Sequence, residues 1–162
     1  MRLLFAVALL ALISAIPVGA EDAADAVQWS WQLQPLDAAA GGEADLVLVA
    51  RIAPRWVVYS SELKAGVGPL PARLRKKPQS AVQLVDGLRS VGASRKQDST
   101  WNAEISYFAG RAELRQRVKL PADGSPVEVI LSGQACYEAD GTCHLLRQDI
   151  SVNSQEAGHS RP

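Results

Sequence analysis

The chain has two cysteines, Cys136 and Cys143, whose type and spacing suggest chemistry directly. They stand at the two ends of a loop that contains the strong turn dipeptide Asp140-Gly141. This order predicts a hairpin in which the two thiols face each other. Directly opposed residues of an antiparallel ladder have Cα atoms about 4.5 to 5.5 Å apart, and a disulfide tolerates roughly 4.4 to 6.8 Å. The two sulfurs can therefore form a bond.

Two functions are open to such a pair. As a structural staple, a bridge across about eight residues is worth roughly 2.5 kcal/mol, against about 4.7 kcal/mol for a hundred-residue loop. A hairpin bridge is therefore an inefficient staple. The alternative is a redox-active pair that exchanges electrons with the thiols of other proteins. The spacing alone does not decide between a structural and a redox-active pair. An oxidising compartment, such as that of an exported protein, is compatible with both.

Other chemistries find less support in the residues. Cys136, Cys143 and His144 offer soft ligands to copper(I) or zinc, but the ligand count is poor for either metal. The only other histidine, His159, falls near the C-terminus, so no Ser-His-Asp arrangement is predicted. We therefore expect neither a metal nor another cofactor.

The N-terminal segment MRLLFAVALLALISAIPVGA predicts a secretory signal peptide, residues 1–20. It has one positive charge at Arg2, an apolar run, and small residues before a cleavage site after Ala20. The apolar run is short for a bilayer span, which takes about 20 residues, and no later segment is apolar over such a length. We expect a periplasmic protein without direct membrane insertion once the signal is removed.

Charge and length limit the possible partners and the number of domains. The whole chain has 17 basic and 17 acidic residues, so a near-neutral balance gives no reason to expect nucleic acid as a partner. Residues 21–152 are long enough for one hydrophobic core and are predicted to form a single domain. The last residues, 153–162 (NSQEAGHSRP), predict a disordered tail.

The hydrophobic pattern of residues 21–152 predicts short β-strands. Residues 27–33 (VQWSWQL) and 111–120 (RAELRQRVKL) alternate apolar and polar side chains, as half-buried strands do, whereas residues 44–53 are apolar on both faces, as in a central strand. Further strands are predicted at 56–59, 81–85, 127–131 and 143–152. With no helical period of 3.6, the chain is predicted to be all-β, an antiparallel β-sandwich.

Two charged features are predicted to be solvated surface. The basic cluster Arg73, Arg75, Lys76 and Lys77 precedes a proline in polar surroundings, which favours a loop in solvent. The charged residues that alternate along 111–119 are predicted to form the solvent-exposed face of a sheet.

The run GQACYEADGTC resembles the redox hairpin of the amino-terminal periplasmic domain of the thiol-disulfide interchange protein DsbD. In that family a glutamine shortly precedes the first cysteine, as Gln134 does here, and a Gly-containing loop leads to the second. The segments WVVYS and WNAEISYFAGRAEL and the cysteine hairpin also come in the family's order. The resemblance covers most of the chain after the signal.

The resemblance implies an immunoglobulin-like β-sandwich that acts as a protein-disulfide reductase or electron-relay component. It would take electrons from a membrane-embedded thiol reductase on another chain and pass them to thioredoxin-fold periplasmic proteins, which in the family include disulfide isomerases and cytochrome c maturation factors. By the same likeness Cys143 bonds to partners and Cys136 resolves the mixed disulfide. The alternative is an exported β-sandwich interaction module with a purely structural disulfide.

The resemblance also implies a cap loop over the cysteines. The matching stretch is Tyr107-Phe108-Ala109-Gly110, with Phe108 as the apolar lid and Gly110 as its hinge. Without the resemblance, Phe108 would be taken for an ordinary core residue.

Three further residues are candidate modulators of the pair: Tyr59, Gln134 and His144. The chain departs from the family where His144 and two leucines replace prolines after the second cysteine. It departs again where Ser106 and Tyr107 replace acidic residues of the cap. Both departures leave the tuning of the thiol pKa open. His144 is expected to face away from Cys143, because neighbouring strand residues alternate sides.

Overall fold

The structure is a computed structural model that describes residues 23–36, 42–63, 66, 68–99 and 101–153. The predicted signal peptide lies outside the described residues, and so does the predicted tail from residue 154 onward. Within the described ranges, no helix has the length and apolar character needed to cross a lipid bilayer.

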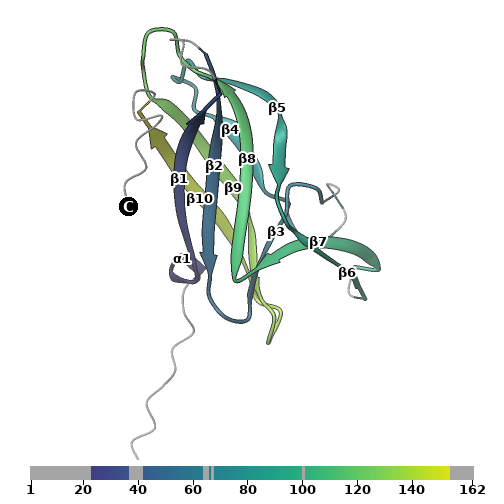
Figure 1. The fold of residues 1–162 in the computed structure, drawn as a ribbon. Helices are drawn as coiled ribbons and strands as arrows, with labels where there is room; N and C mark the ends of the chain where they lie inside the picture. The colour runs from purple at the N-terminus through teal and green to yellow at the C-terminus, as the bar shows by residue number, and fades with distance from the viewer. Residues whose placement is uncertain (1–22, 37–41, 64–65, 67, 100, 154–162) are drawn as a thin grey trace, which may run out of the picture.

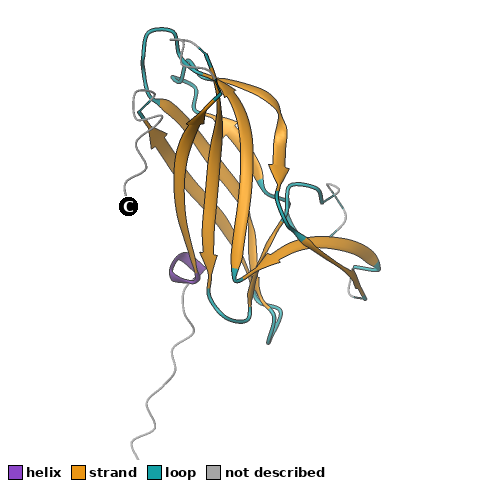
Figure 2. Cartoon of the chain, viewed as in Figure 1, coloured by secondary structure: helices purple, strands orange, loops and turns teal. Residues whose placement is uncertain are grey.

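The described chain forms two antiparallel β-sheets packed face to face, with one helix of four residues (Figures 1 and 2). The first sheet has the order β1-β2-β8-β5, and the second has the order β10-β9-β3-β7-β6, with β4 paired to β9. The all-β, immunoglobulin-like sandwich prediction is confirmed. The elements are α1 (Ala23–Ala26), β1 (Val27–Pro35), β2 (Glu43–Ile52), β3 (Trp56–Tyr59), β4 (Arg73–Lys76), β5 (Gln83–Ser90), β6 (Ser94–Asp98), β7 (Ala103–Ala109), β8 (Arg111–Lys119), β9 (Val127–Tyr137) and β10 (Cys143–Val152).

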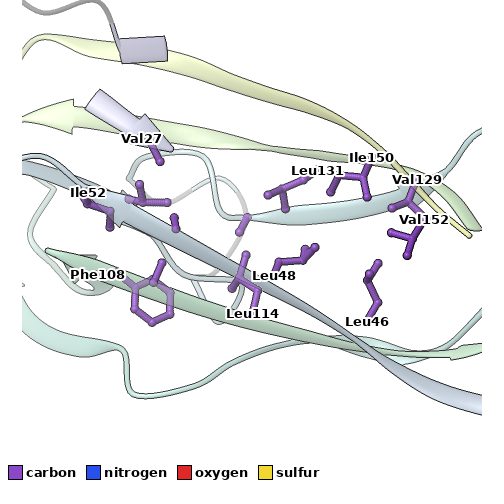
Figure 3. Packing of buried hydrophobic residues seen from close by; sticks show 14 of the residues in the cluster. Val27, Leu46, Leu48, Ile52, Phe108, Leu114, Val129, Leu131, Ile150 and Val152 are labelled. Carbon is purple, nitrogen blue, oxygen red and sulfur yellow. The ribbon is translucent and has the colours of Figure 1, made fainter. Parts of the chain in front are cut away.

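The core lies between the two sheets and is built from the apolar rows that the alternation predicts. Leu46, Leu48 and Leu114 of the first sheet face Leu131 and Ile150 of the second, and all five are buried (Figure 3). Each such aliphatic side chain contributes about 1.5–3 kcal/mol on burial. Strand β2 pairs on both edges, with β1 and β8, so it is a central strand of the first sheet, as its sequence predicts.

Three parts of the structure differ from the sequence predictions. The basic cluster was expected to be a solvated loop, but Arg73–Lys76 is strand β4, whose register with β9 places Leu74 opposite Leu131. Leu74 packs on the core, while Arg73 and Arg75 on either side of it are exposed to solvent. Strands β6 and β7 were not predicted, and β5 begins at Gln83 rather than at residue 81.

Candidate redox site

Cys136 and Cys143 lie directly opposite each other in the β9–β10 ladder and form a disulfide, with Cα atoms 4.0 Å apart. The turn beyond them is held by local hydrogen bonds: the Tyr137 N–H donates to the Thr142 carbonyl (2.8 Å), and the Thr142 N–H donates to the Asp140 carboxylate (2.8 Å). Pairs in an antiparallel ladder alternate between hydrogen-bonded and non-hydrogen-bonded types. Because Tyr137 and Thr142 form a hydrogen-bonded pair, the neighbouring pair Cys136 and Cys143 is a non-hydrogen-bonded one, the type in which opposed Cα atoms lie closest.

The two cysteines differ sharply in exposure. Cys136 lies on β9, between β3 and β10, and only 4% of its surface is exposed. Cys143 is the first residue of β10, which is an edge strand of the second sheet, and it is exposed. A foreign sulfur can therefore approach the disulfide from the side of Cys143.

A small apolar cluster surrounds Cys136 on the outer face of the second sheet, the face that points away from the first sheet. Register explains it: Cys136 pairs with Val57, and Tyr59 pairs with Tyr107, so these side chains share one face. We call this group the cysteine cluster; it consists of Val57, Tyr59, Leu63, Ile105 and Cys136, with Tyr107 packed against them. Burial raises the pKa of Tyr59 above its ordinary value.

An ion pair crosses the cysteine cluster. Lys96, on β6, reaches over the ring of Tyr107 at 4.8 Å, and its Nζ lies 3.0 Å from Oε1 of Glu138, two residues after Cys136. Burial alone would lower the pKa of Lys96, but the hydrogen bond and charge of Glu138 raise it. The pair ties the β6–β7 ribbon, which projects from the body of the sandwich, to the cysteine hairpin (Figure 1).

Gln134 anchors the loop beside the disulfide. It lies on the outer face, two residues before Cys136, and its Oε1 accepts a hydrogen bond from the Leu70 N–H at 2.8 Å. The same loop passes close to Trp101, since a side chain at Gly68 would meet the indole ring at 3.5 Å. Gln134 thus holds the loop that borders the site.

The structure corrects the expected cap. Residues 107–109 belong to strand β7 rather than to a loop. Phe108 pairs with Val58, so the two side chains lie on the face of the sheet opposite to that of Cys136. Its ring is buried in the main core, near Ile52 and Leu114 (Figure 3). The side chain of this stretch that the register puts on the cysteine face is Tyr107.

Gly110 and His144, which were expected to belong to the site, lie outside the cysteine cluster. Gly110 has a φ of 71° at the point where the chain leaves β7 in the second sheet and enters β8 in the first. His144 lies on the core side of β10, with its ring 5.7 Å from that of Trp56. Neither residue is part of the cysteine cluster.

Sequence reasoning did not identify Lys96, Glu138 or Leu70 as parts of the site. Lys96 belongs to a polar strand without an apolar alternation, and only the pairing of β6 with β7 brings it across the cluster. In the part of the chain that the structure describes, no group of three or more His, Cys, Asp and Glu side chains is placed to hold a metal ion.

The fold and the site together define a class: a two-sheet β-sandwich that carries a one-sidedly exposed disulfide at the tip of an edge hairpin. The family model described as "Thiol:disulfide interchange protein DsbD, N-terminal" matches residues 17–154. The chain belongs to this family of periplasmic thiol-disulfide exchange domains.

Solved structures give likenesses at low identity. The N-terminal periplasmic domain of ScsB from Proteus mirabilis matches with a TM-score of 0.59 and 13% identity, over 87% of this chain and 49% of that one. This chain therefore spans about half the length of that structure, and the likeness shows the fold alone.

Two structures from Neisseria meningitidis are also similar. The DsbD N-terminal domain in its reduced form matches at a TM-score of 0.46 and 19% identity, over 75% of this chain and 86% of that one. The complex of the DsbD N-terminal and PilB N-terminal domains matches at a TM-score of 0.47 and 14% identity, over 76% of this chain and 80% of that one. Comparison with curated proteins gives no match.

Proposed function

We propose that the domain relays electrons between a membrane-embedded thiol reductase on another chain and thioredoxin-fold periplasmic proteins, through the pair Cys136 and Cys143. Residues 1–20 act as a cleavable export signal, residues 21–152 form the working domain, and residues 153–162 are a tail. Cys143 bonds to partners and Cys136 resolves the bond. Family membership and the one-sided exposure of the disulfide support this proposal.

The observation that carries the proposal is the different exposure of two bonded sulfurs. A structural bridge needs neither sulfur in solvent, whereas exchange needs one that an incoming thiolate can reach. Cys143 meets this requirement at the edge of the sheet. Cys136 is buried but stays directly opposite Cys143, so it is placed to attack once Cys143 has bonded to a partner.

The reaction follows from this placement. In the reduced domain the Cys143 thiolate attacks one sulfur of a partner's disulfide; the partner's S–S bond breaks, and its second sulfur leaves as a thiolate. The Cys136 thiolate then attacks Cys143, restores the intrachain disulfide, and releases the partner fully reduced. Two electrons pass to the partner, and the membrane reductase returns them to the domain by the same steps in reverse.

Trapping tests the assignment of the two cysteines. A Cys136→Ala variant is expected to accumulate a mixed disulfide with an oxidised thioredoxin-fold protein, because nothing resolves the bond at Cys143. The matched Cys143→Ala variant is expected to give at least about tenfold less adduct, since its remaining thiol is buried and reacts according to access. Non-reducing gel electrophoresis and mass spectrometry measure both. Equal trapping by the two variants, or none by Cys136→Ala, contradicts the assignment.

A further inference from the structure

The outer face of the second sheet continues beyond the disulfide, along the edge strand that begins with Cys143. Strand alternation decides which side chains it carries, and their exposure agrees: odd-numbered residues of β10 are exposed up to Ser151, while Ile150 and Val152 are buried. Beyond the cysteines, this face carries the side chains that are in phase with Cys136 and Cys143: Leu145, Arg147, Asp149 and Ser151 of β10, Gln134, Ser132, Ile130 and Glu128 of β9, and Arg73 and Arg75 of β4.

Next to the disulfide this face is apolar. Leu145 is two residues after Cys143 and 76% exposed, and Leu70 is 52% exposed. The two leucines flank Gln134, which is the cross-strand partner of Leu145 and accepts the hydrogen bond from the Leu70 N–H. Two exposed leucines at the open side of a disulfide form a contact that a protein can cover and a small thiol cannot use.

Farther along the strand the face becomes basic. Its cations are Arg73, Arg75, Lys77 and Arg147, and the carboxylates on the same face are Glu128 and Asp149. Asp149 pairs with both Lys77 (3.2 Å) and Arg147 (3.3 Å), while Arg75 has no ion pair within the described chain. Arg147 is four residues from Cys143, which corresponds to about 14 Å along a strand.

We infer that this face, the docking face formed by Leu70, Leu145, Arg73, Arg75 and Arg147, receives the thioredoxin-fold partner. The inference rests on the proposed function. A partner whose sulfur reaches Cys143 approaches from the outer face, because the opposite side of β10 packs on the core. The partner that fits carries an apolar rim around its reactive cysteine and acidic residues about 14 Å from that sulfur.

Charge reversal tests the basic half of the docking face. The full mature domain in its oxidised form is reduced either by a reduced thioredoxin of net negative charge or by dithiothreitol, which needs no docking. The double variant Arg75→Glu/Arg147→Glu is expected to react about tenfold more slowly with thioredoxin at low ionic strength, with a flatter salt dependence. Its rate with dithiothreitol stays unchanged, which also shows that it is folded.

The first sheet provides the matched control. Arg51 and Lys119 are exposed on its outer face, on the other side of the sandwich from the disulfide, so Arg51→Glu/Lys119→Glu changes the net charge equally. This control is expected to keep at least about half of the thioredoxin rate. An equal loss in both double variants would show that only net charge matters, and would overturn the docking face.

Leu145→Ser tests the apolar half. It is expected to slow the reaction with thioredoxin about fivefold at every salt concentration and to leave the dithiothreitol rate unchanged. Wild-type rates in Leu145→Ser and in Arg75→Glu/Arg147→Glu would overturn the inference while the proposed function stands. If dithiothreitol reduces the disulfide and thioredoxin does not reduce even the wild-type domain, the proposed function itself fails.

Discussion

At the scale of the residue, the sheet gives two chemically identical cysteines different surroundings. Cys136 shares a face with Val57 and Tyr59 and is buried among them, whereas Cys143 begins an edge strand. Both the sequence and the register place the two sulfurs opposite each other, but only the register shows which one solvent reaches. The asymmetry is therefore a property of strand order, which neither cysteine's neighbours in the sequence specify.

Tyr59 carries a prediction at this scale. Burial raises its pKa above 10.0, with Asp98 and Glu138 acting in the same direction and Lys96 against it. A group with a raised folded-state pKa stabilises the fold fully below its unfolded pKa, and this stability is lost as pH rises through the folded value. The free energy of unfolding of the wild type should therefore fall above about pH 10 more steeply than that of Tyr59→Phe. Denaturant unfolding between about pH 8 and 11 would measure this.

A spectroscopic titration provides the independent check. The difference in tyrosinate absorbance between the wild type and Tyr59→Phe reports the titration of Tyr59 itself. Its midpoint is expected above the ordinary value of 10.0. A midpoint at or below that value would show that the cysteine cluster does not shield the hydroxyl.

At the scale of the element, Gly110 is the position where one residue turns the chain from the second sheet into the first. Its φ of 71° lies in the left-handed region, and its carbonyl accepts the Ile52 N–H at 2.9 Å. A side chain there has open space, so Gly110→Ala tests backbone strain alone and is expected to cost about 1–2 kcal/mol of unfolding free energy. Denaturant unfolding measures it.

Gly87 is the control for this substitution. It also has open space, but its backbone is not left-handed, so Gly87→Ala is expected to leave the unfolding free energy unchanged or slightly raised. Equal losses in the two variants would contradict the role given to the turn at Gly110.

The pattern of apolar and polar residues along each strand decides which parts of this fold can be predicted from the sequence and which cannot. The segments 27–33 and 111–119 alternate, so their strands and buried rows are predictable from side-chain types. In Ile105, Ser106, Tyr107 and Phe108, by contrast, large apolar residues fall on both faces, and the sequence cannot tell which face meets the cysteines. The register shows that it is the face of Ile105 and Tyr107, so the lid role expected of Phe108 is not available to it.

At the scale of the whole molecule, the disulfide lies at one end of the sandwich, and Cys136 packs in a cluster separate from the main core between the two sheets. The β9–β10 pairing runs without a break from Cys136 and Cys143 to Val127 and Val152, and its inner row packs on the first sheet. The hairpin is therefore held by its ladder and by the core as well as by the sulfur bond. We therefore expect the surrounding structure to persist when the bond opens, as the proposed electron relay requires.

This arrangement predicts how the whole domain responds to reduction. Opening the disulfide is expected to cost no more than about 2.5 kcal/mol, because it closes only a short loop. Near-ultraviolet circular dichroism of the two redox forms should nearly superimpose, with changes in amide exchange confined to residues 134–145. The reduction potential should lie among those of thiol carriers, about −270 to −120 mV. A potential below about −300 mV, together with loss of the sandwich on reduction, would instead identify a structural staple in an interaction module.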